Sequence, residues 1–146
     1  MFRGSSPAKI DTKGRLKVPT EFRRLLDERY GPEVFITSVQ GRSAMLYPLD
    51  AWERVEQKLA EVPSSNRSKQ RFLERVNYFG QQLRLDAQGR VVIPQILRER
   101  AEIHGEVVVS GRIEHLEVWN RELFDQKLLE EPFTEEDFEA LAERGI

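Results

Sequence analysis

The fold of this chain is decided by the stretch Asp11-Thr12-Lys13-Gly14-Arg15-Leu16-Lys17-Val18-Pro19, which returns 75 residues later as Asp86-Ala87-Gln88-Gly89-Arg90-Val91-Val92-Ile93-Pro94. The likeness continues through Phe22-Arg23 and Leu97-Arg98. A repeat of this kind within 146 residues indicates a tandem duplication of one small structural unit. Because small units bury little apolar surface on their own, we expect each copy to need a partner.

Each copy begins with a turn between two short strands. Asp at the first position and Gly at the fourth is the pattern of a type I turn, so turns are predicted at 11–14 and 86–89. Extended residues precede each turn, and β-branched or alternating residues follow it, which predicts a strand on both sides. Pro19 and Pro94 then stop strand pairing and suit the first turn of a helix.

The rest of the unit repeats as well. Apolar residues at helical spacing follow each proline and predict helices that end at Gly31 and Gly105. A second pair of strands comes next in each copy, at 34–37 with 45–47 and at 107–109 with 116–119. A further helix then follows each unit. The unit is therefore β-turn-β-helix-β-β, and we predict an α+β fold rich in β-structure.

The pattern divides the chain into four segments: the first repeat with its helix at 1–62, a linker and helix at 63–79, the second repeat with its helix at 80–129, and an acidic tail at 130–146. The linker helix carries an apolar stripe that we expect in the core. A capping-box variant at Thr134 predicts a short helix in the tail, which should be peripheral. Its apolar residues favour packing against the same chain; they are Leu128, Leu129, Phe133, Phe138 and Leu141.

The charges are unevenly distributed along the chain. The net charge of −2 hides segments of +4 at 1–30, −2 at 31–63, +5 at 64–100 and −9 at 101–146. A polyanion responds to the local field rather than to the net charge, so the two basic segments are compatible with a nucleic-acid surface. A mixed, solvated surface is the alternative explanation.

The duplicated motif resembles that of the MraZ family, within the AbrB/MazE-like swapped-hairpin group. The resemblance rests on Asp-x-x-Gly-Arg before a β-branched strand and Pro, present twice, and on strands that end in Tyr47 and Trp119 before a helix. It covers nearly the whole chain. It implies a double-split β-barrel built from the two repeats of one chain. It also implies ring-shaped homo-oligomers that bind direct repeats in the promoter of a division and cell-wall gene cluster to which their own gene belongs.

Nine basic side chains are candidates for contact with double-stranded DNA: Arg15, Arg90, Lys13, Lys9, Arg3, Lys17, Arg23, Arg24 and Arg84. Arg15 and Arg90 come first, because arginine can bind a phosphate or a guanine edge through two parallel hydrogen bonds. Several cations on one hairpin also favour binding through counterion release. On alternating strand positions, one face should hold Lys9, Asp11, Lys13, Arg15 and Lys17.

Four further residues of the motif are expected to shape the turns and orient the arginines: Asp11, Gly14, Asp86 and Gly89. An Asp–Arg pair that only staples its turn is the alternative, and we favour it for the two aspartates. For Arg15 we favour DNA contact, because a staple would not need the neighbouring lysines. The second repeat should contribute less, since Gln88 replaces Lys13 and Glu99 replaces Arg24.

Nothing in the sequence predicts an enzyme, a cofactor or a small-molecule substrate. P-loop, Gly-x-Gly-x-x-Gly and Gly-x-Ser-x-Gly motifs are absent, and the chain has no cysteine for a disulfide or a thiolate metal site. His104 and His115 are expected on the surface rather than as metal ligands. The chain has no apolar run near the roughly 20 residues that a membrane helix needs, so we expect a cytoplasmic protein at the nucleoid.

Two other hypotheses remain open. An antitoxin-like interaction module would use the acidic tail to cover a toxin, and that tail would be disordered until it binds. A purely structural ring protein would not bind DNA, and Arg15→Ala would leave its activities intact.

Overall fold

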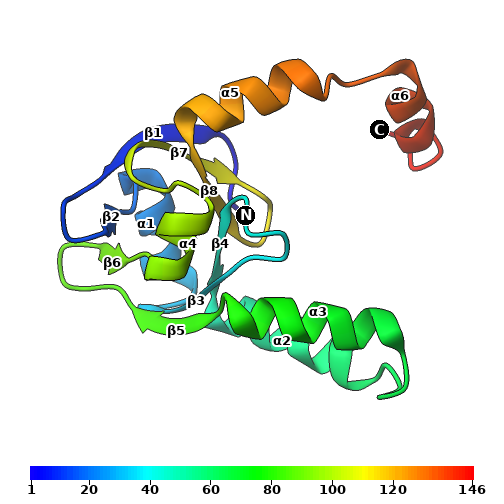
Figure 1. Cartoon of the computed structure of the whole chain (residues 1–146), viewed down its shortest axis with the longest axis horizontal. Coiled ribbons are helices and arrows are strands. Elements are labelled where there is room, and N and C mark those ends of the chain that lie inside the picture. The colour runs from blue at the N-terminus through cyan, green and yellow to red at the C-terminus, as the bar shows by residue number, and fades with distance from the viewer.

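An eight-stranded antiparallel sheet, nearly closed into a barrel, forms the centre of the molecule (Figure 1). The computed structural model describes residues 1–146. The strands are β1 (Ser5–Ile10), β2 (Arg15–Lys17), β3 (Glu33–Thr37), β4 (Ala44–Pro48), β5 (Gln81–Arg84), β6 (Arg90–Val92), β7 (Gly105–Gly111) and β8 (Leu116–Asn120). Their order in the sheet is β5-β3-β4-β8-β7-β1-β2-β6. The α+β class and the duplicated barrel predicted from the sequence are confirmed.

The two repeats share this sheet strand by strand. Strand β1 of the first repeat pairs with β7 of the second, β4 pairs with β8, and β3 pairs with β5. The short strands β2 and β6, which follow the two turns, pair with each other. Neither repeat could therefore bury its own strand edges alone, which explains physically why the unit occurs twice.

The core fills the inside of the barrel. Strands β3 and β4 alternate buried with half-buried positions, as expected when one face of a sheet is covered. Two helices add to the same cluster of 21 buried residues: α1 (Thr20–Arg29) supplies Phe22 and Leu26, and α4 (Gln95–Arg100) supplies Leu97. Full burial of such a side chain stabilises the fold by roughly 1.5–3 kcal/mol.

Aromatic side chains attach two further helices to the outer face of the sheet. In α2 (Leu49–Ala60), Trp52 stacks on Phe35 of β3 with ring centroids 4.8 Å apart and meets Tyr47 of β4 edge-on at 5.0 Å. In α5 (Arg121–Glu130), Phe124 lies 5.5 Å from Trp119 of β8. Asparagines cap α5 and α3 (Arg67–Tyr78), because Asn120 and Asn66 accept backbone N–H groups of the first turn.

Some helix ends differ from the prediction. Pro19 and Pro94 lie one position before their helices rather than in the first turn. Gly31 follows α1 with a φ of +99°, as predicted. In the second repeat, however, α4 ends at Arg100, and Glu102 takes the left-handed conformation with a φ of +53°. Gly105 instead begins β7. The second helix is thus shorter than the glycine pattern indicated.

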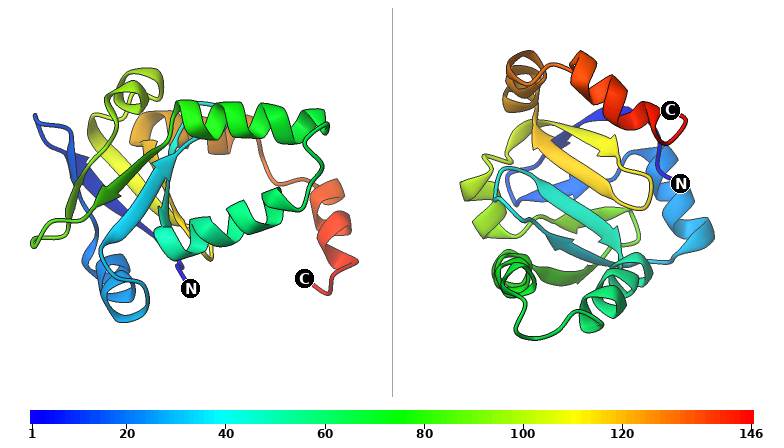
Figure 2. Two further views of the ribbon diagram at one scale, coloured as in Figure 1. Left: turned by 90° about the horizontal axis from the view of Figure 1, so that it is seen from below. Right: turned by 90° about the vertical axis from the view of Figure 1, so that its right-hand side faces the viewer.

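Helices α2 and α3 form an arm that projects from one end of the barrel (Figure 2). The apolar stripe of α3 is buried at its C-terminal end, where Val76 and Phe79 lie, whereas Phe72 and Leu73 are half-buried. The prediction that this stripe belongs to the core therefore holds for its barrel end.

The acidic tail projects from the same end of the molecule (Figures 1 and 2). Its helix α6 (Glu135–Ala142) begins at Thr134 with the predicted capping box. The expected packing of its apolar residues is wrong: Leu129 is 83% exposed, and Phe133 and Phe138 are each 59% exposed. Every residue from 128 to 146 is exposed, because the tail projects away from the barrel (Figure 1). Its two phenylalanine rings pack only on each other, with centroids 4.7 Å apart.

None of the six helices has the length and apolar content that crossing a membrane requires.

Candidate nucleic-acid interface

The two predicted turns have nearly identical geometry. The Asp11 carboxylate accepts the backbone N–H groups of Lys13 and Arg15, both at 2.9 Å, and the Arg15 Nε–H at 2.7 Å. In the second repeat the Asp86 carboxylate accepts the same three bonds, from the backbone of Gln88 and Arg90 at 2.9 Å and from the Arg90 Nε–H at 3.1 Å. Each aspartate therefore shapes its turn and also holds its arginine in one orientation.

These hydrogen bonds stabilise the ionised aspartates. The backbone N–H of Arg15, with help from its guanidinium and from the Lys13 N–H, lowers the pKa of Asp11 below its usual 3.8. The Arg90 backbone N–H has the same effect on the pKa of Asp86. Both arginines use Nε for this contact, and their terminal nitrogens donate no hydrogen bond within the chain, so both retain donors for a further anion.

The two turns hold each other reciprocally. The Val18 N–H donates to the carbonyl of Gly89, and the equivalent Ile93 N–H donates to the carbonyl of Gly14, both at 2.9 Å. Between them Leu16 lies opposite Val91, and both side chains are buried. The interlocked turns form a rigid base for the side chains on the outer face of β2 and β6.

Two arginines at equivalent repeat positions reinforce this arrangement. The Arg23 guanidinium donates to the carbonyl of Ala87 at 2.8 Å and lies against Gly89. The Arg98 guanidinium lies against Gly14 in the same way and donates to the carbonyl of Ile93 at 2.9 Å. Arg23, a candidate for DNA contact, is thus occupied in joining the repeats. The sequence pattern placed Arg98 in the repeat, 75 residues after Arg23, but no role was predicted for it.

A cationic face covers the outer side of β1, β2 and β6. Lys17 lies directly opposite Arg90 in the sheet, and Arg15 lies opposite Val92. Because Ile10 pairs with Leu16, the antiparallel register sets Lys9 beside Lys17. The structure therefore brings together four of the predicted side chains, and we call Lys9, Arg15, Lys17 and Arg90 the cationic face.

Arg3 lies beside this face rather than on it. It lines a groove of about 770 Å³ together with Lys9 and Lys17, between β1 and the start of α1. Arg24 is exposed farther along α1 and lines a smaller, neighbouring hollow of about 230 Å³ with Arg3. Both can extend a positive surface from the cationic face onto α1.

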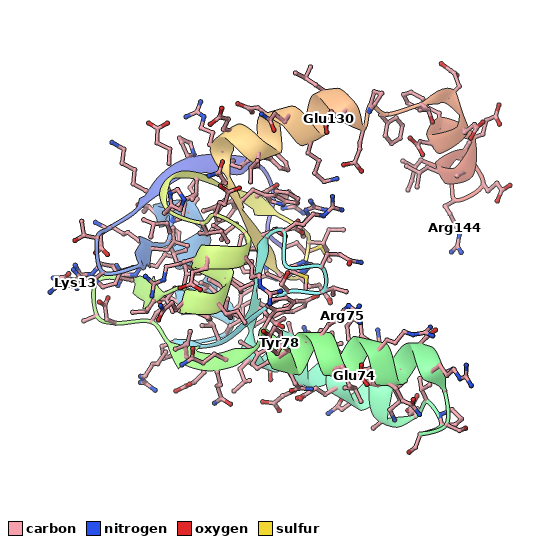
Figure 3. All side chains as sticks on the ribbon, viewed as in Figure 1. Lys13, Glu74, Arg75, Tyr78, Glu130 and Arg144 are labelled. Atoms are coloured by element: carbon pink, nitrogen blue, oxygen red, sulfur yellow. The ribbon has the colours of Figure 1, made fainter.

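The remaining two candidates lie at the edges of this region. Lys13 is exposed at the tip of the first turn, at the end of the molecule opposite the helical arms (Figure 3). Arg84 lies on β5, the strand that leads into the second turn, at the position equivalent to Lys9 of the first repeat. Its guanidinium pairs with Glu33 of β3 at 2.6 Å, and this ion pair already occupies it.

The two histidines lie in different surroundings, and His104 lines a hollow beside the first turn together with Asp11 and Gly14. His104 is exposed, as expected. The expectation for His115 was wrong, because its ring is half-buried and stacks on Tyr47 with centroids 4.2 Å apart. Burial lowers the pKa of His115. No group of three or more potential metal ligands gathers anywhere in the structure.

Comparison with known proteins agrees with the duplicated architecture. The family described as "MraZ protein, putative antitoxin-like" matches residues 1–75 and 80–146. The chain is 55% identical over 146 residues to the transcriptional regulator MraZ of Acidobacterium capsulatum, with both chains covered completely. It is 48% identical to that of Koribacter versatilis over 147 residues, again across both chains, and 37% identical over 130 residues to that of Acidithiobacillus ferrooxidans, with 86% of each chain covered. The chain therefore belongs to the MraZ family, whose members are transcriptional regulators and not enzymes.

Proposed function

We propose that this regulator binds double-stranded DNA through the cationic face, and that Arg15 is its principal reader. The proposal rests chiefly on the pairing of Arg15 with Asp11. A guanidinium already held by a carboxylate loses little freedom when it binds, while its terminal nitrogens remain available for a phosphate or a guanine edge. Arg90 has the same arrangement with Asp86.

Neighbouring cations add affinity that does not depend on sequence. Lys9 and Lys17 flank the arginines, and Lys13 extends the charge to the tip of the turn. Each phosphate that such a side chain neutralises releases counterions and steepens the dependence of affinity on salt. Lysines therefore hold the duplex while the arginines read it.

The second repeat is the weaker contributor in this proposal. Gln88 and Glu99 replace the cations Lys13 and Arg24, and Val92 takes the place of Lys17. Val92 is an apolar side chain, 43% exposed, directly opposite Arg15 on the same side of the sheet. An exposed valine at this position suits apolar contact with a base edge, such as a thymine methyl group.

We further propose that the protein acts as a ring-shaped homo-oligomer on direct repeats in the promoter of its own gene cluster, at the nucleoid. One chain offers only one small cationic face. Copies linked in an oligomer would bind repeated sites together and gain roughly 10²–10⁴ in avidity. This gain explains how a chain with a net charge of −2 can bind DNA.

Fluorescence anisotropy tests whether Arg15 recognises the DNA sequence. The purified protein is titrated into a labelled duplex from upstream of its own gene and into a scrambled duplex, at rising salt. We expect selective, salt-sensitive binding by the wild type. Arg15→Ala should lose selectivity and roughly 5- to 150-fold in affinity, because a bidentate base contact contributes about 1–3 kcal/mol.

The matched control is Arg42→Ala. Arg42 is an exposed arginine in the β3–β4 connection and takes part in no ion pair. The affinity of Arg42→Ala for DNA should equal that of the wild type. Wild-type binding without selectivity, or an Arg15→Ala variant that binds normally, would contradict the proposal.

The exposed tail favours one other candidate function, an antitoxin-like module that covers a protein toxin. Its apolar residues lack a cover in the isolated chain. Limited proteolysis tests this idea, because a tail that awaits a foreign partner should be cut rapidly in the purified protein. A resistant tail would exclude it.

A further inference from the structure

We propose that helix α6 of one chain docks on helix α3 of a second copy, through a stripe of glutamates that meets a stripe of arginines. The inference rests on the proposed homo-oligomer and names the surfaces that would join its subunits. The observations that carry it are the exposed state of the tail, the spacing of the two stripes and the absence of ion-pair partners for either.

The tail needs a cover that its own chain does not supply. Six large apolar side chains are exposed between 128 and 146; besides the five discussed above, Ile146 is 82% exposed. Uncovered apolar residues on this scale mark an interaction surface. Phe133 and Phe138 pack on each other edge-to-face, so the tail already presents an ordered aromatic pair.

The charged residues of α6 lie in register on one side of the helix. Glu135, Glu139 and Glu143 are spaced by four residues, and Glu143 continues the helical backbone with φ −60° and ψ −24°. None of the three forms an ion pair in the structure. Like charges at this spacing repel one another, so cations bound along the stripe would stabilise the helix.

Helix α3 carries the opposite stripe at the same spacing. Arg67, Arg71 and Arg75 follow one another every four residues, all are exposed, and none forms an ion pair. Half-buried Phe72 lies beside them and provides apolar surface for the tail. Two helices with complementary stripes of equal length can pair all three glutamates with all three arginines.

The geometry of one chain favours docking between copies. Contacts with β8 anchor α5, and a short connection, 131–134, leads on to α6. The views in Figures 1 and 2 show α6 held apart from α3 of the same chain. Figure 3 shows Arg75 on α3 and Arg144 on α6 separated by the open side of the molecule. A second copy can approach both helices from that side.

Such a contact joins two different surfaces, one on each partner. Contacts of this head-to-tail kind link copies in a continuing series that can close into a ring. Every subunit then gives its tail to one neighbour and receives the tail of the other. Strands β2 and β6, which carry three of the four residues of the cationic face, lie at the opposite end from α3 and α6 (Figure 1), so this face remains free in each subunit.

Charge reversal tests the interface with the full-length protein and no DNA. The tail variant combines Glu135→Lys, Glu139→Lys and Glu143→Lys, and the α3 variant combines Arg67→Glu, Arg71→Glu and Arg75→Glu. Light scattering and sedimentation velocity give the mass. We expect an oligomeric wild type, whereas each variant alone should shift toward the 17.1 kDa of one chain.

Mixing identifies the docking partner. In an equimolar mixture, the positive tail of one variant meets the negative α3 of the other, and the unchanged stripes meet in the remaining contact. The mixture should therefore regain the wild-type mass. Docking within one chain predicts no recovery on mixing, and that result would overturn the proposal.

Two controls complete the experiment. A variant with Glu28→Lys, Glu56→Lys and Glu122→Lys changes the charge by the same amount at exposed positions on other helices and should keep the wild-type mass. Circular dichroism of all variants verifies folding. A tail variant that keeps its mass but binds DNA more tightly would overturn the proposal and assign the tail to the cationic face. A monomeric wild type that still reads DNA would overturn the interface alone.

Discussion

The carboxylate of Asp11 performs two tasks that the sequence presented as alternatives. It closes the turn through two backbone N–H groups, and it also holds the Arg15 guanidinium. The sequence could predict the turn because Asp and Gly have strong positional preferences. It could not decide between the staple and the orienter, because both follow from the same spacing and one carboxylate has oxygens for both.

The lowered pKa of Asp11 predicts how stability depends on pH. Its folded pKa lies below 3.8, so its ionised form contributes stability above the unfolded pKa, and that contribution is lost as the pH falls through the folded pKa. Asp11→Asn should therefore unfold at a lower temperature than the wild type near neutral pH, and the difference should shrink below about pH 4. Thermal unfolding by circular dichroism across that range measures both effects.

The control for this comparison is Asp125→Asn. Asp125 is exposed on α5 and takes part in no ion pair. Its unfolding temperature should follow that of the wild type at every pH. A difference between Asp11→Asn and the wild type that stays constant down to about pH 2 would refute the linkage.

At the level of elements, the reciprocal contact between the two turns decides the architecture. The apolar patterns of β2 and β6 predicted two buried strands but not that they pair with each other. Pairing across 75 residues depends on the closure of the whole barrel, and no local pattern contains that information. The contacts of Arg23 and Arg98 with opposite turns were hidden for the same reason.

Gly14 offers a direct test of this contact. A Cβ at Gly14 would lie 2.4 Å from the guanidinium carbon of Arg98, on a backbone with a φ of +79°. Gly31 has a φ of +99° but open space around it. Gly31→Ala should cost about 1 kcal/mol of unfolding free energy through backbone strain alone, and Gly14→Ala should cost roughly 1 kcal/mol more. Urea denaturation measures both.

Removal of the Arg98 side chain separates the two costs of Gly14→Ala. The double variant Gly14→Ala with Arg98→Ala should lose less stability than the sum of its single changes, because the clash disappears with the side chain. Strict additivity would show that Arg98 does not press on the turn, and equal costs for Gly14→Ala and Gly31→Ala would show the same.

For the whole molecule, the sequence predicted that the tail has an apolar surface but not which surface covers it. The capping box at Thr134 correctly indicated a short helix in the tail, and the apolar residues nearby indicated a surface that needs to be covered. They then suggested packing within the chain, whereas the structure leaves those residues exposed. A pattern records that a surface should be buried, and the identity of the covering molecule lies outside the pattern.

The gain in affinity from one promoter repeat to two should show whether the copies bind DNA as one assembly. If copies act together, the wild type should bind a duplex with two promoter repeats far more tightly than one with a single repeat, by roughly 10²–10⁴. The tail variant should lose that gain and keep its affinity for the single repeat. Anisotropy titrations with the two duplexes measure the ratio, and a ratio unaffected by the tail variant would contradict a role for the tail in assembly.

The reciprocal bonds of Val18 and Ile93 also bear on how such a protein can change over time. A barrel made from two identical chains must carry every substitution twice, once in each half. Fusion of the halves into one polypeptide removes that obligation, while the same bonds hold the two turns together. One half is then free to keep a lysine at position 17 while the other acquires a valine at 92. The two halves thus keep the same backbone shape while their exposed side chains can differ in chemistry.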